Sequence, residues 1–238
     1  MLWDVAQIRI QRSFQQFLPS SKMSLKKAYL FGYNVIQLLG WSYLLFIYIT
    51  ESEASGAWLT ISPKVEFLLQ VFQTLAFLEV IHAVTRLVRS SPFTTALQLF
   101  SRVFLVWGIL YLIPQVKLQS YGIPLIMIPW CLSEMIRYAY YATNVYCPAP
   151  TLITWLRYSG FVVLYPCGVT GELLLMYGAV QEKDQCDRYS LKLPNTLNCS
   201  FDYRCMIVLL MLSYVPFFPK LFGHMVSQRK KVFKVKAQ

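Results

Sequence analysis

The chain has 238 residues, of which 56% are hydrophobic and only 14% are charged, and its mean hydropathy is +0.46. A soluble domain is usually about 45–50% apolar and about 25% charged, so this composition excludes a disordered chain, a fibrous protein and most soluble enzymes. It is typical of a polytopic membrane protein with one domain. The net charge of +11 comes from basic residues in the tails and between apolar blocks, which indicates anionic lipid rather than a nucleic-acid partner.

The predicted elements begin after residues 1–27, which are polar and basic and which we expect to form a cytosolic amino-terminal segment. Six apolar blocks follow, each close to the ~20 residues that a helix needs to cross a ~30 Å hydrocarbon core. They lie at Ala28–Thr50, Val65–Leu87, Phe93–Ile113, Tyr121–Tyr141, Leu152–Val180 and Met206–Phe222. The sequence therefore predicts an all-α polytopic membrane domain over 28–222, with six transmembrane helices around a central substrate cavity, and a basic cytosolic tail over 223–238.

The distribution of lysine and arginine predicts the orientation of these spans. Both tails are strongly basic, and an even number of spans then places both termini in the cytosol. The loop before the sixth block carries charges of both signs and argues weakly against this orientation. Asn198 begins a glycosylation sequon in a loop expected in the lumen, and Lys234 and Lys236 suit a retrieval signal of the endoplasmic reticulum. A chance sequon and a basic tail on anionic lipid are the alternatives, and the predicted location is the endoplasmic reticulum membrane.

Cysteines and histidines are too few and too scattered for a metal centre. Six cysteines without a CxxC pair make neither a zinc site nor a disulfide framework, although Cys186, Cys199 and Cys205 could form one bridge or remain thiols. Two histidines cannot hold a di-iron centre. Neither GxGxxG after a strand nor GxxxxGK[ST] occurs. We therefore expect no metal and no cofactor.

Ionisable residues inside the apolar blocks are candidates for function, because burying a charge in hydrocarbon costs at least about 2.5–3.5 kcal/mol. Glu79 and His82 are spaced to share a helix face, and so are Glu134 and Arg137. For each pair, a structural ion pair that locks helices together is as good an interpretation as a functional one. Two further polar residues, Gln98 and Arg102, could join the same interior.

The fifth block combines a phenol and a carboxylic acid. Tyr165 and Glu172 are nearly two helical turns apart, so their side chains lie on one face about 10.5 Å apart along the axis. Tyr158 continues this stripe, and Pro166 can kink the helix. Gly168 and Gly171 allow another helix or a substrate chain to approach closely. A reaction pocket and a packing stripe explain the spacing equally well, and a pocket of this kind would suit proton transfer.

Cys131 and Arg137 have the Cys-x5-Arg spacing of a tyrosine-phosphatase loop. That loop needs free backbone N–H groups to hold phosphate. Here the intervening residues lie in an apolar helical block and include an acidic residue, so we reject phosphatase activity.

Five runs carry a resemblance to a known family. They are FLEVIHAVTRLVRSSP (77–92), QLFSRVFLVWGILYLIPQV (98–116), SEMIRYAYY (133–141), WLRYSGFVVLYPCGVTGELLLMY (155–177) and PNTLNCSFDY (194–203). The chain resembles the membrane 3-hydroxyacyl-CoA dehydratases of very-long-chain fatty acid elongation, also called protein tyrosine phosphatase-like proteins. The resemblance extends from about Tyr29 to the end and is strongest to the plant PASTICCINO-type members.

The resemblance implies a lyase that removes water from (3R)-3-hydroxyacyl-CoA to give trans-2-enoyl-CoA, the third step of elongation, without a cofactor. It implies a catalytic pair at Tyr165 and Glu172. The resemblance leaves open which of the two is acid and which is base; of the two arrangements, we favour Glu172 as the acid that protonates the leaving hydroxyl. The implied partners are the acyl-CoA substrate, membrane lipid, and the condensing enzyme, ketoacyl reductase and enoyl reductase of the elongase. The supporting or substrate-contact positions that it implies are Glu79, Gln98, Arg102, Glu134, Arg137, Tyr138, Arg157 and Gly168.

Two other functions fit a membrane protein of this kind. A non-catalytic scaffold of the elongase complex would need the same helices but neither member of the Tyr165–Glu172 pair. A transporter would favour an internal repeat or broken half-helices, and the six blocks show no clear repeat. We expect CoA, which is rich in phosphate, to lie at the basic cytosolic face, near Arg89, Arg157 and the tail lysines.

Overall fold

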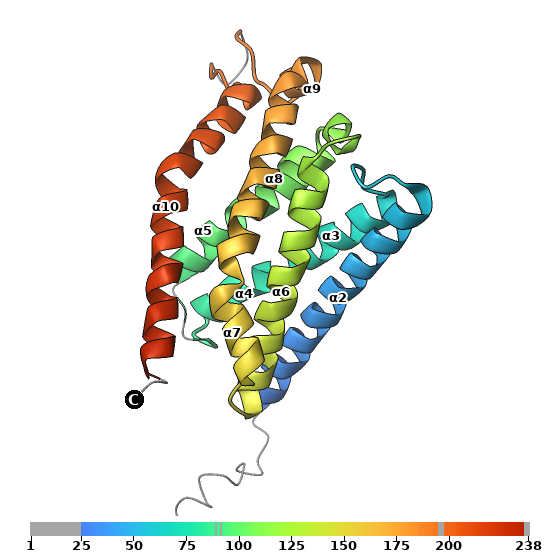
Figure 1. Ribbon diagram of the computed structural model, residues 1–238. Coiled ribbons are helices and arrows are strands. Elements are labelled where there is room, and N and C mark those ends of the chain that lie inside the picture. The colour runs from blue at the N-terminus through green and yellow to red at the C-terminus, as the bar shows by residue number, and fades with distance from the viewer. Residues whose placement is uncertain (1–24, 89, 91, 195–197, 236–238) are drawn as a thin grey trace, which may run out of the picture.

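The computed structural model describes residues 25–88, 90, 92–194 and 198–235, in which every regular element is helical (Figure 1). The only β contact in these ranges is an isolated bridge between Leu191 and Phe201. In chain order the elements are α2 (Leu25–Ser55), α3 (Pro63–Leu75), α4 (Phe77–Val84), α5 (Pro92–Val103), the π-helix η1 (Phe104–Tyr111), the 3₁₀-helix η2 (Pro114–Lys117), α6 (Gly122–Tyr146), α7 (Thr151–Ser159), α8 (Phe161–Gln181), α9 (Lys183–Arg188) and α10 (Tyr203–Val235).

All six predicted blocks are helical, but three of them are interrupted. The second divides into α3 and α4 at Ala76, whose carbonyl accepts a tight hydrogen bond from the Glu79 amide at 3.0 Å. Its helix ends at Val84 rather than at the predicted Leu87, because Arg86 adopts a φ of 55° that no α-helix continues. The third block changes from α5 to a π-helix, and the fifth divides into α7 and α8 at Gly160.

The sixth block is longer than predicted. Its helix, α10, begins at Tyr203 and continues to Val235, through residues that we assigned to the basic tail. Lysine and arginine near the carboxyl end of a helix interact favourably with the helix dipole, which explains why the helix does not stop at the end of the apolar block. Residues 1–24 and 236–238, which hold most of the predicted amino-terminal segment and part of the retrieval signal, lie outside the described residues.

Four helical segments are long and apolar enough to cross a membrane. They are Leu25–Ser55, Pro63–Val84, Phe161–Gln181 and Tyr203–Phe233, and a shorter apolar segment covers Leu99–Tyr111. The predicted number of six spans is therefore not reached by length and hydropathy. The fourth block became α6, a 25-residue helix whose buried face carries the polar side chains described below.

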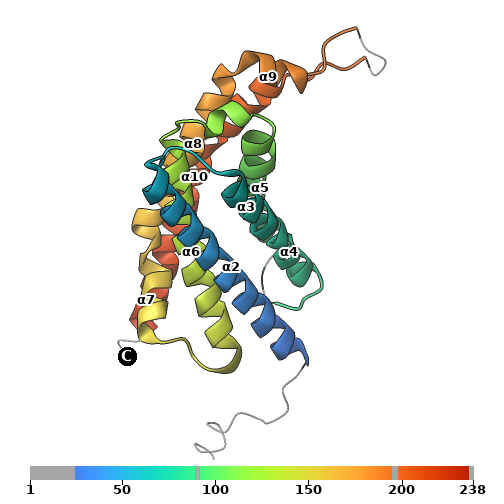
Figure 2. The same cartoon turned by 90° about the vertical axis from the view of Figure 1, so that its right-hand side faces the viewer.

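The core lies around α6, which packs against both α2 and α8 (Figure 2). The contact between α6 and α8 is close because Gly171 has no side chain: a Cβ atom there would lie 2.8 Å from the backbone carbonyl carbon of Leu125. Buried residues of α6, such as Ile126 and Met127, fill the interior together with Leu44 of α2. The sequence prediction that small residues in the fifth block allow close helix packing is confirmed at Gly171.

The connections gather at two ends of the bundle (Figures 1 and 2). We call the end where α2 begins and α10 finishes the tail end; it also holds the α4–α5 and α6–α7 connections. We call the opposite end, with the α2–α3 connection, η2 and α9, the loop end. A hydrogen bond of 2.9 Å from the Ser120 amide to the Leu59 carbonyl ties two loop-end connections together.

Candidate functional site

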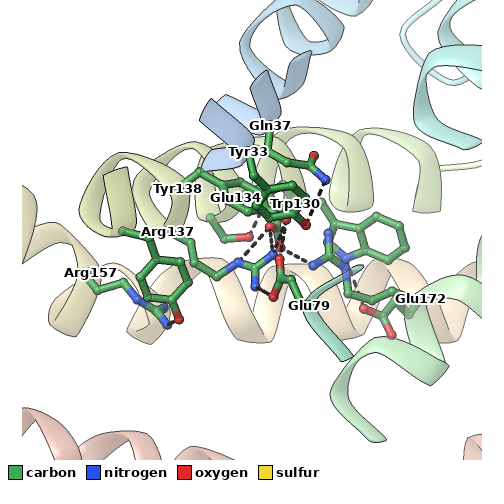
Figure 3. A network of polar contacts seen from close by, with 12 residues as sticks. Tyr33, Gln37, Glu79, Trp130, Glu134, Arg137, Tyr138, Arg157 and Glu172 are labelled. Carbon is green, nitrogen blue, oxygen red and sulfur yellow. Dashed lines mark hydrogen bonds and ion pairs between the residues drawn. The ribbon is translucent and has the colours of Figure 1, made fainter. Parts of the chain in front are cut away.

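A network of buried charges connects α4, α5 and α6 (Figure 3). Glu134 is only 3% exposed, and its carboxylate accepts hydrogen bonds from both Arg102 and Arg137. Arg137 also donates to Glu79 across 2.5 Å, and the Tyr138 hydroxyl donates to the other oxygen of Glu79 across 2.5 Å. Two arginines and two glutamates balance in charge, which allows the network to remain ionised inside an apolar bundle.

The predicted pairing of Glu134 with Arg137 is therefore confirmed, and that of Glu79 with His82 is not. Glu79 turns toward α6, whereas His82 contacts the Tyr29 hydroxyl of α2 at 2.9 Å. Residues three apart share a helix face, but the face they share here meets two different helices. Glu79 is therefore paired with α6, and His82 with α2.

The carboxylate of Glu172 is clamped by two neutral donors from different helices. Glu172 is 6% exposed; the Trp130 indole N–H of α6 donates to Oε1 at 3.1 Å, and the Tyr214 hydroxyl of α10 donates to Oε2 at 2.5 Å. Figure 3 shows Trp130 directed toward Glu172. A buried carboxyl group with both oxygens held by neutral donors is fixed in orientation, which suits a positioned acid or base.

Arg102 connects the charge network to this clamp. Its guanidinium lies over the Trp130 ring, 4.7 Å from the ring centre, while it pairs with Glu134. Trp130 also packs against the open face of Gly168, where a Cβ atom would lie 3.6 Å from the indole. Arg102 and Gly168 therefore adjoin Trp130, Glu134 is paired with Arg102, and Trp130 in turn donates to Glu172.

Tyr165 and Glu172 face the same neighbour, α10. The Tyr165 ring stacks on Phe218 with 5.0 Å between ring centres and an angle of 4° between the rings, and Tyr214, four residues earlier on α10, holds Glu172. Consecutive turns of α10 thus contact the two side chains, as their spacing predicted. The contact between α8 and α10 that includes these residues is called the α8–α10 seam below.

The seam continues into an apolar groove of about 370 Å³ on the loop-end side of Glu172. Three residues of α8 and three of α10 form its walls: Leu173, Tyr177, Val180, Val208, Met211 and Leu212. Beyond the groove, the Arg204 side chain donates to the Val180 carbonyl at 3.1 Å. Toward the tail end, Arg229 donates to the Ser159 hydroxyl at 3.1 Å, so the seam has a basic end.

Two predicted site residues are not part of this cluster. Arg157 contacts the Tyr141 ring, 5.8 Å from its centre, and Figure 3 shows it well apart from Glu172. Gln98 lies on α5, but its side chain is outside the described part of the structure. Within the described residues, no group of three or more His, Cys, Asp or Glu side chains could hold a metal ion.

Sequence reasoning missed the two residues that hold Glu172. Trp130 and Tyr214 are each 42 residues from Glu172, and both lie in apolar blocks where an aromatic residue looks like ordinary packing. Their polar ends are the available signal, since the N–H of a buried Trp and the O–H of a buried Tyr usually require a partner. No spacing in the sequence identifies Glu172 as that partner.

Comparison with known proteins decides the family. The model of the family described as protein tyrosine phosphatase-like protein, PTPLA, matches residues 73–235, which include Tyr165, Glu172 and the residues around them. The chain belongs to the protein tyrosine phosphatase-like family. No solved structure matches the chain.

Relatives of this chain are named as dehydratases, not as phosphatases. The very-long-chain (3R)-3-hydroxyacyl-CoA dehydratase hpo-8 of Caenorhabditis elegans is 44% identical over 207 residues, covering 87% of this chain and 94% of the relative. Dehydratase 2 of Homo sapiens is 40% identical, covering 87% and 82%. The Arabidopsis thaliana dehydratase PASTICCINO 2 is 38% identical, covering 87% and 93%.

The phosphatase-like spacing itself lies in a helix. Cys131 is fully buried in α6, and Arg137 is bound by two carboxylates. The N–H groups of a helix interior are already used within the helix, so the run between these residues offers no cradle for phosphate. The predicted rejection of a phosphatase site therefore agrees with the position of both residues.

Proposed function

We propose that the protein removes water from a (3R)-3-hydroxyacyl-CoA to give the trans-2-enoyl-CoA, as the third step of very-long-chain fatty acid elongation, and that Tyr165 and Glu172 carry the reaction. The observation that supports this most directly is the clamp on Glu172. Its carboxyl group is held by Trp130 of α6 and Tyr214 of α10, and Tyr165 contacts the same helix α10 through Phe218. The names of the relatives supply the reaction class.

The proposed elimination moves two protons. A base removes the proton on C2, the C2–C3 double bond forms, and the C3 hydroxyl leaves as water after an acid protonates it. We assign the acid to Glu172 and the base to Tyr165. Glu172 lies beside the apolar groove, on the side where the acyl chain continues from C3, whereas Tyr165 lies toward the basic tail end, on the side of C2 and the thioester.

The basic tail end suits the CoA part of the substrate. Arg229 contacts Ser159 at that end, and Arg157 lies two residues before Ser159 on α7. Guanidinium groups bind phosphate well, so the phosphates of CoA would be bound outside the hydrocarbon while the acyl chain remains within it. The order of chemical groups along the α8–α10 seam then matches the order of groups along the substrate.

We also propose the predicted topology: six crossings within the domain 28–222, both termini in the cytosol, and residence in the endoplasmic reticulum membrane beside the other elongase enzymes. The alternation of connections between the tail end and the loop end supports an even number of crossings. The α6 helix falls below the hydropathy of a typical span because Glu134 and Arg137 are on its buried face, where they neutralise each other.

Purified protein in detergent tests the catalytic pair. We expect Tyr165→Phe and Glu172→Gln each to lower kcat for (3R)-3-hydroxyacyl-CoA by about 10²-fold or more, since positioned acids and bases contribute about 10²–10⁴-fold. Tyr158→Phe is a matched control, because Tyr158 lies on the same stripe but packs against Tyr140. Wild-type rates in both variants would refute the assignment of the pair.

Complementation separates the enzyme from the scaffold. A cell that lacks its own dehydratase should grow with the wild-type protein and not with the Tyr165→Phe, Glu172→Gln double variant. Growth with the double variant at equal protein level would favour a scaffold that acts without its own chemistry.

A further inference from the structure

The apolar groove between α8 and α10 begins beside Glu172, the residue that we place next to C3 of the substrate. Leu173 follows Glu172 directly, and Met211 is one helical turn from Tyr214, so the near end of the groove meets the clamped carboxylate. From Glu172 to Val180 the α8 wall rises about 12 Å, at about 1.5 Å per residue. The groove is therefore a continuation of the candidate site, and its axis points away from Tyr165.

We propose that this groove binds the first part of the acyl chain beyond C3. The chain reaches Met211, Val208 and Val180 in that order, and these residues determine the preference for chain length. This inference rests on the proposed function, because it takes the acyl-CoA as substrate and Glu172 as the residue at C3. All six lining residues present hydrocarbon or an aromatic ring, which is the chemistry that an alkyl chain requires and a CoA group does not.

The three residues lie at increasing distance from the clamp. Along α10, Met211 is about 4.5 Å and Val208 about 9 Å from the level of Tyr214. On α8, Val180 is the last lining residue, and its carbonyl is held by Arg204 at 3.1 Å. With C–C bonds of about 1.5 Å, an extended chain advances roughly 1.3 Å per carbon. The tail of a hydroxyoctanoyl group thus ends before Val208, and that of a hydroxystearoyl group passes it.

The test compares two substrates in each variant. The quantity measured is the ratio of kcat/KM for (3R)-3-hydroxystearoyl-CoA to kcat/KM for (3R)-3-hydroxyoctanoyl-CoA. We expect Val208→Trp to lower this ratio by about 10-fold or more, since an indole in the path of the chain must be displaced by the longer substrate. Met211→Trp, nearer the clamp, should lower kcat/KM for both substrates, and the ratio should change less than in Val208→Trp.

Leu209→Trp is the matched control. Leu209 adjoins Val208 on α10, is 61% exposed and does not line the groove, so the same substitution there should leave the ratio within about twofold of wild type. Should Val208→Trp fail to fold, Val180→Phe on the opposite wall carries the same expectation. Equal ratios in the Val208 and Leu209 variants would overturn the groove assignment even if the protein is an active dehydratase, and a wild-type protein inactive on both substrates would overturn the proposed function instead.

Discussion

At the scale of single residues, the stability of the interior depends on Glu134, the carboxylate that two arginines share. Replacing it with glutamine leaves Arg102 and Arg137 with one carboxylate, that of Glu79, between them. Removing one partner of a buried ion pair is strongly destabilising, by about 3–5 kcal/mol, because the remaining charge is left uncompensated. We expect Glu134→Gln to lower the free energy of unfolding in detergent by about this amount, measured by thermal or denaturant unfolding.

The exposed ion pair of Lys192 with Asp187 provides the control for that measurement. Both side chains are largely in solvent at the loop end, where such pairs contribute little. Asp187→Asn should therefore leave the unfolding transition where it is. Comparable losses in the two variants would mean that burial of Glu134 has no special part in stability.

Gln73 presents the opposite case, a buried polar side chain without a partner. It is fully buried on the interior face of α3, and neither its amide nitrogen nor its oxygen has a hydrogen-bond partner among the described residues. An unsatisfied buried polar group costs about 1–3 kcal/mol. Gln73→Met, which keeps the length of the side chain, should therefore leave unfolding unchanged or raise its free energy by up to about that amount.

The neighbouring Gln70 gives the comparison for this substitution. It is only partly buried on the same helix, and its amide donates to Glu66 at 3.4 Å, so Gln70→Met has no buried polar group to relieve. A larger loss of stability in Gln73→Met than in Gln70→Met would contradict the interpretation of Gln73.

The sequence could identify which residues are buried and charged, but only some of their partners. Spacing within one helix predicted the contact between Glu134 and Arg137. The contacts of Arg102 with Glu134, 32 residues apart, and of Tyr214 with Glu172, 42 residues apart, join different helices. These contacts depend on which helix faces meet when the helices pack, and residue spacing in the sequence does not predict this.

At the scale of elements, alanine substitution is expected to have opposite effects on stability at Gly171 in the fifth block and Gly32 in the first. A Cβ atom on Gly171 would lie 2.8 Å from the backbone of Leu125, so α6 would have to move. A Cβ atom on Gly32 of α2 would meet no heavy atom within 4 Å. We expect Gly171→Ala to destabilise by about 1–3 kcal/mol, as overpacking does, and Gly32→Ala to stabilise by about 0.5–1 kcal/mol through helix propensity.

Thermal unfolding of the two variants measures the expected loss of stability at Gly171 and the expected gain at Gly32 with the same glycine-to-alanine substitution. Gly168→Ala is informative beside them, since its new methyl group would lie at an ordinary 3.6 Å from Trp130. Like Gly32→Ala, it should therefore gain up to about 0.5–1 kcal/mol through helix propensity. A Gly171→Ala protein as stable as wild type would show that α6 and α8 can separate at no cost.

Element positions were predictable and element ends were not. Hydropathy located all six helical blocks, because each must present an apolar surface. The breaks at Ala76 and Gly160 and the change to a π-helix at Phe104 leave that surface unchanged. They follow from local backbone hydrogen bonds and from contacts such as the one that the Tyr203 hydroxyl makes to the Gly108 carbonyl at 2.7 Å, which hydropathy does not report.

At the scale of the whole molecule, the orientation of the bundle and the crossing made by α7 and α8 can be tested with two native cysteines. Cys147 is exposed in the α6–α7 connection at the tail end, and Cys205 is exposed in the first turn of α10 at the loop end. With both termini in the cytosol, the tail end faces the cytosol and the loop end the lumen. A variant that retains only Cys147 should react with a membrane-impermeant maleimide in sealed microsomes, and one that retains only Cys205 should react only after the membrane is permeabilised.

The two single-cysteine variants control each other, because they share the protein, the reagent and the vesicles. Labelling of Cys205 in intact vesicles, with Cys147 protected, would reverse the orientation, and labelling of both would place them on the same side, which requires an even number of crossings between them. The expected pattern places the basic end of the α8–α10 seam, with Arg229, on the side where acyl-CoA is soluble. The substrate could then enter with its phosphates in water while its chain remains in the membrane, as the order of groups along the seam requires.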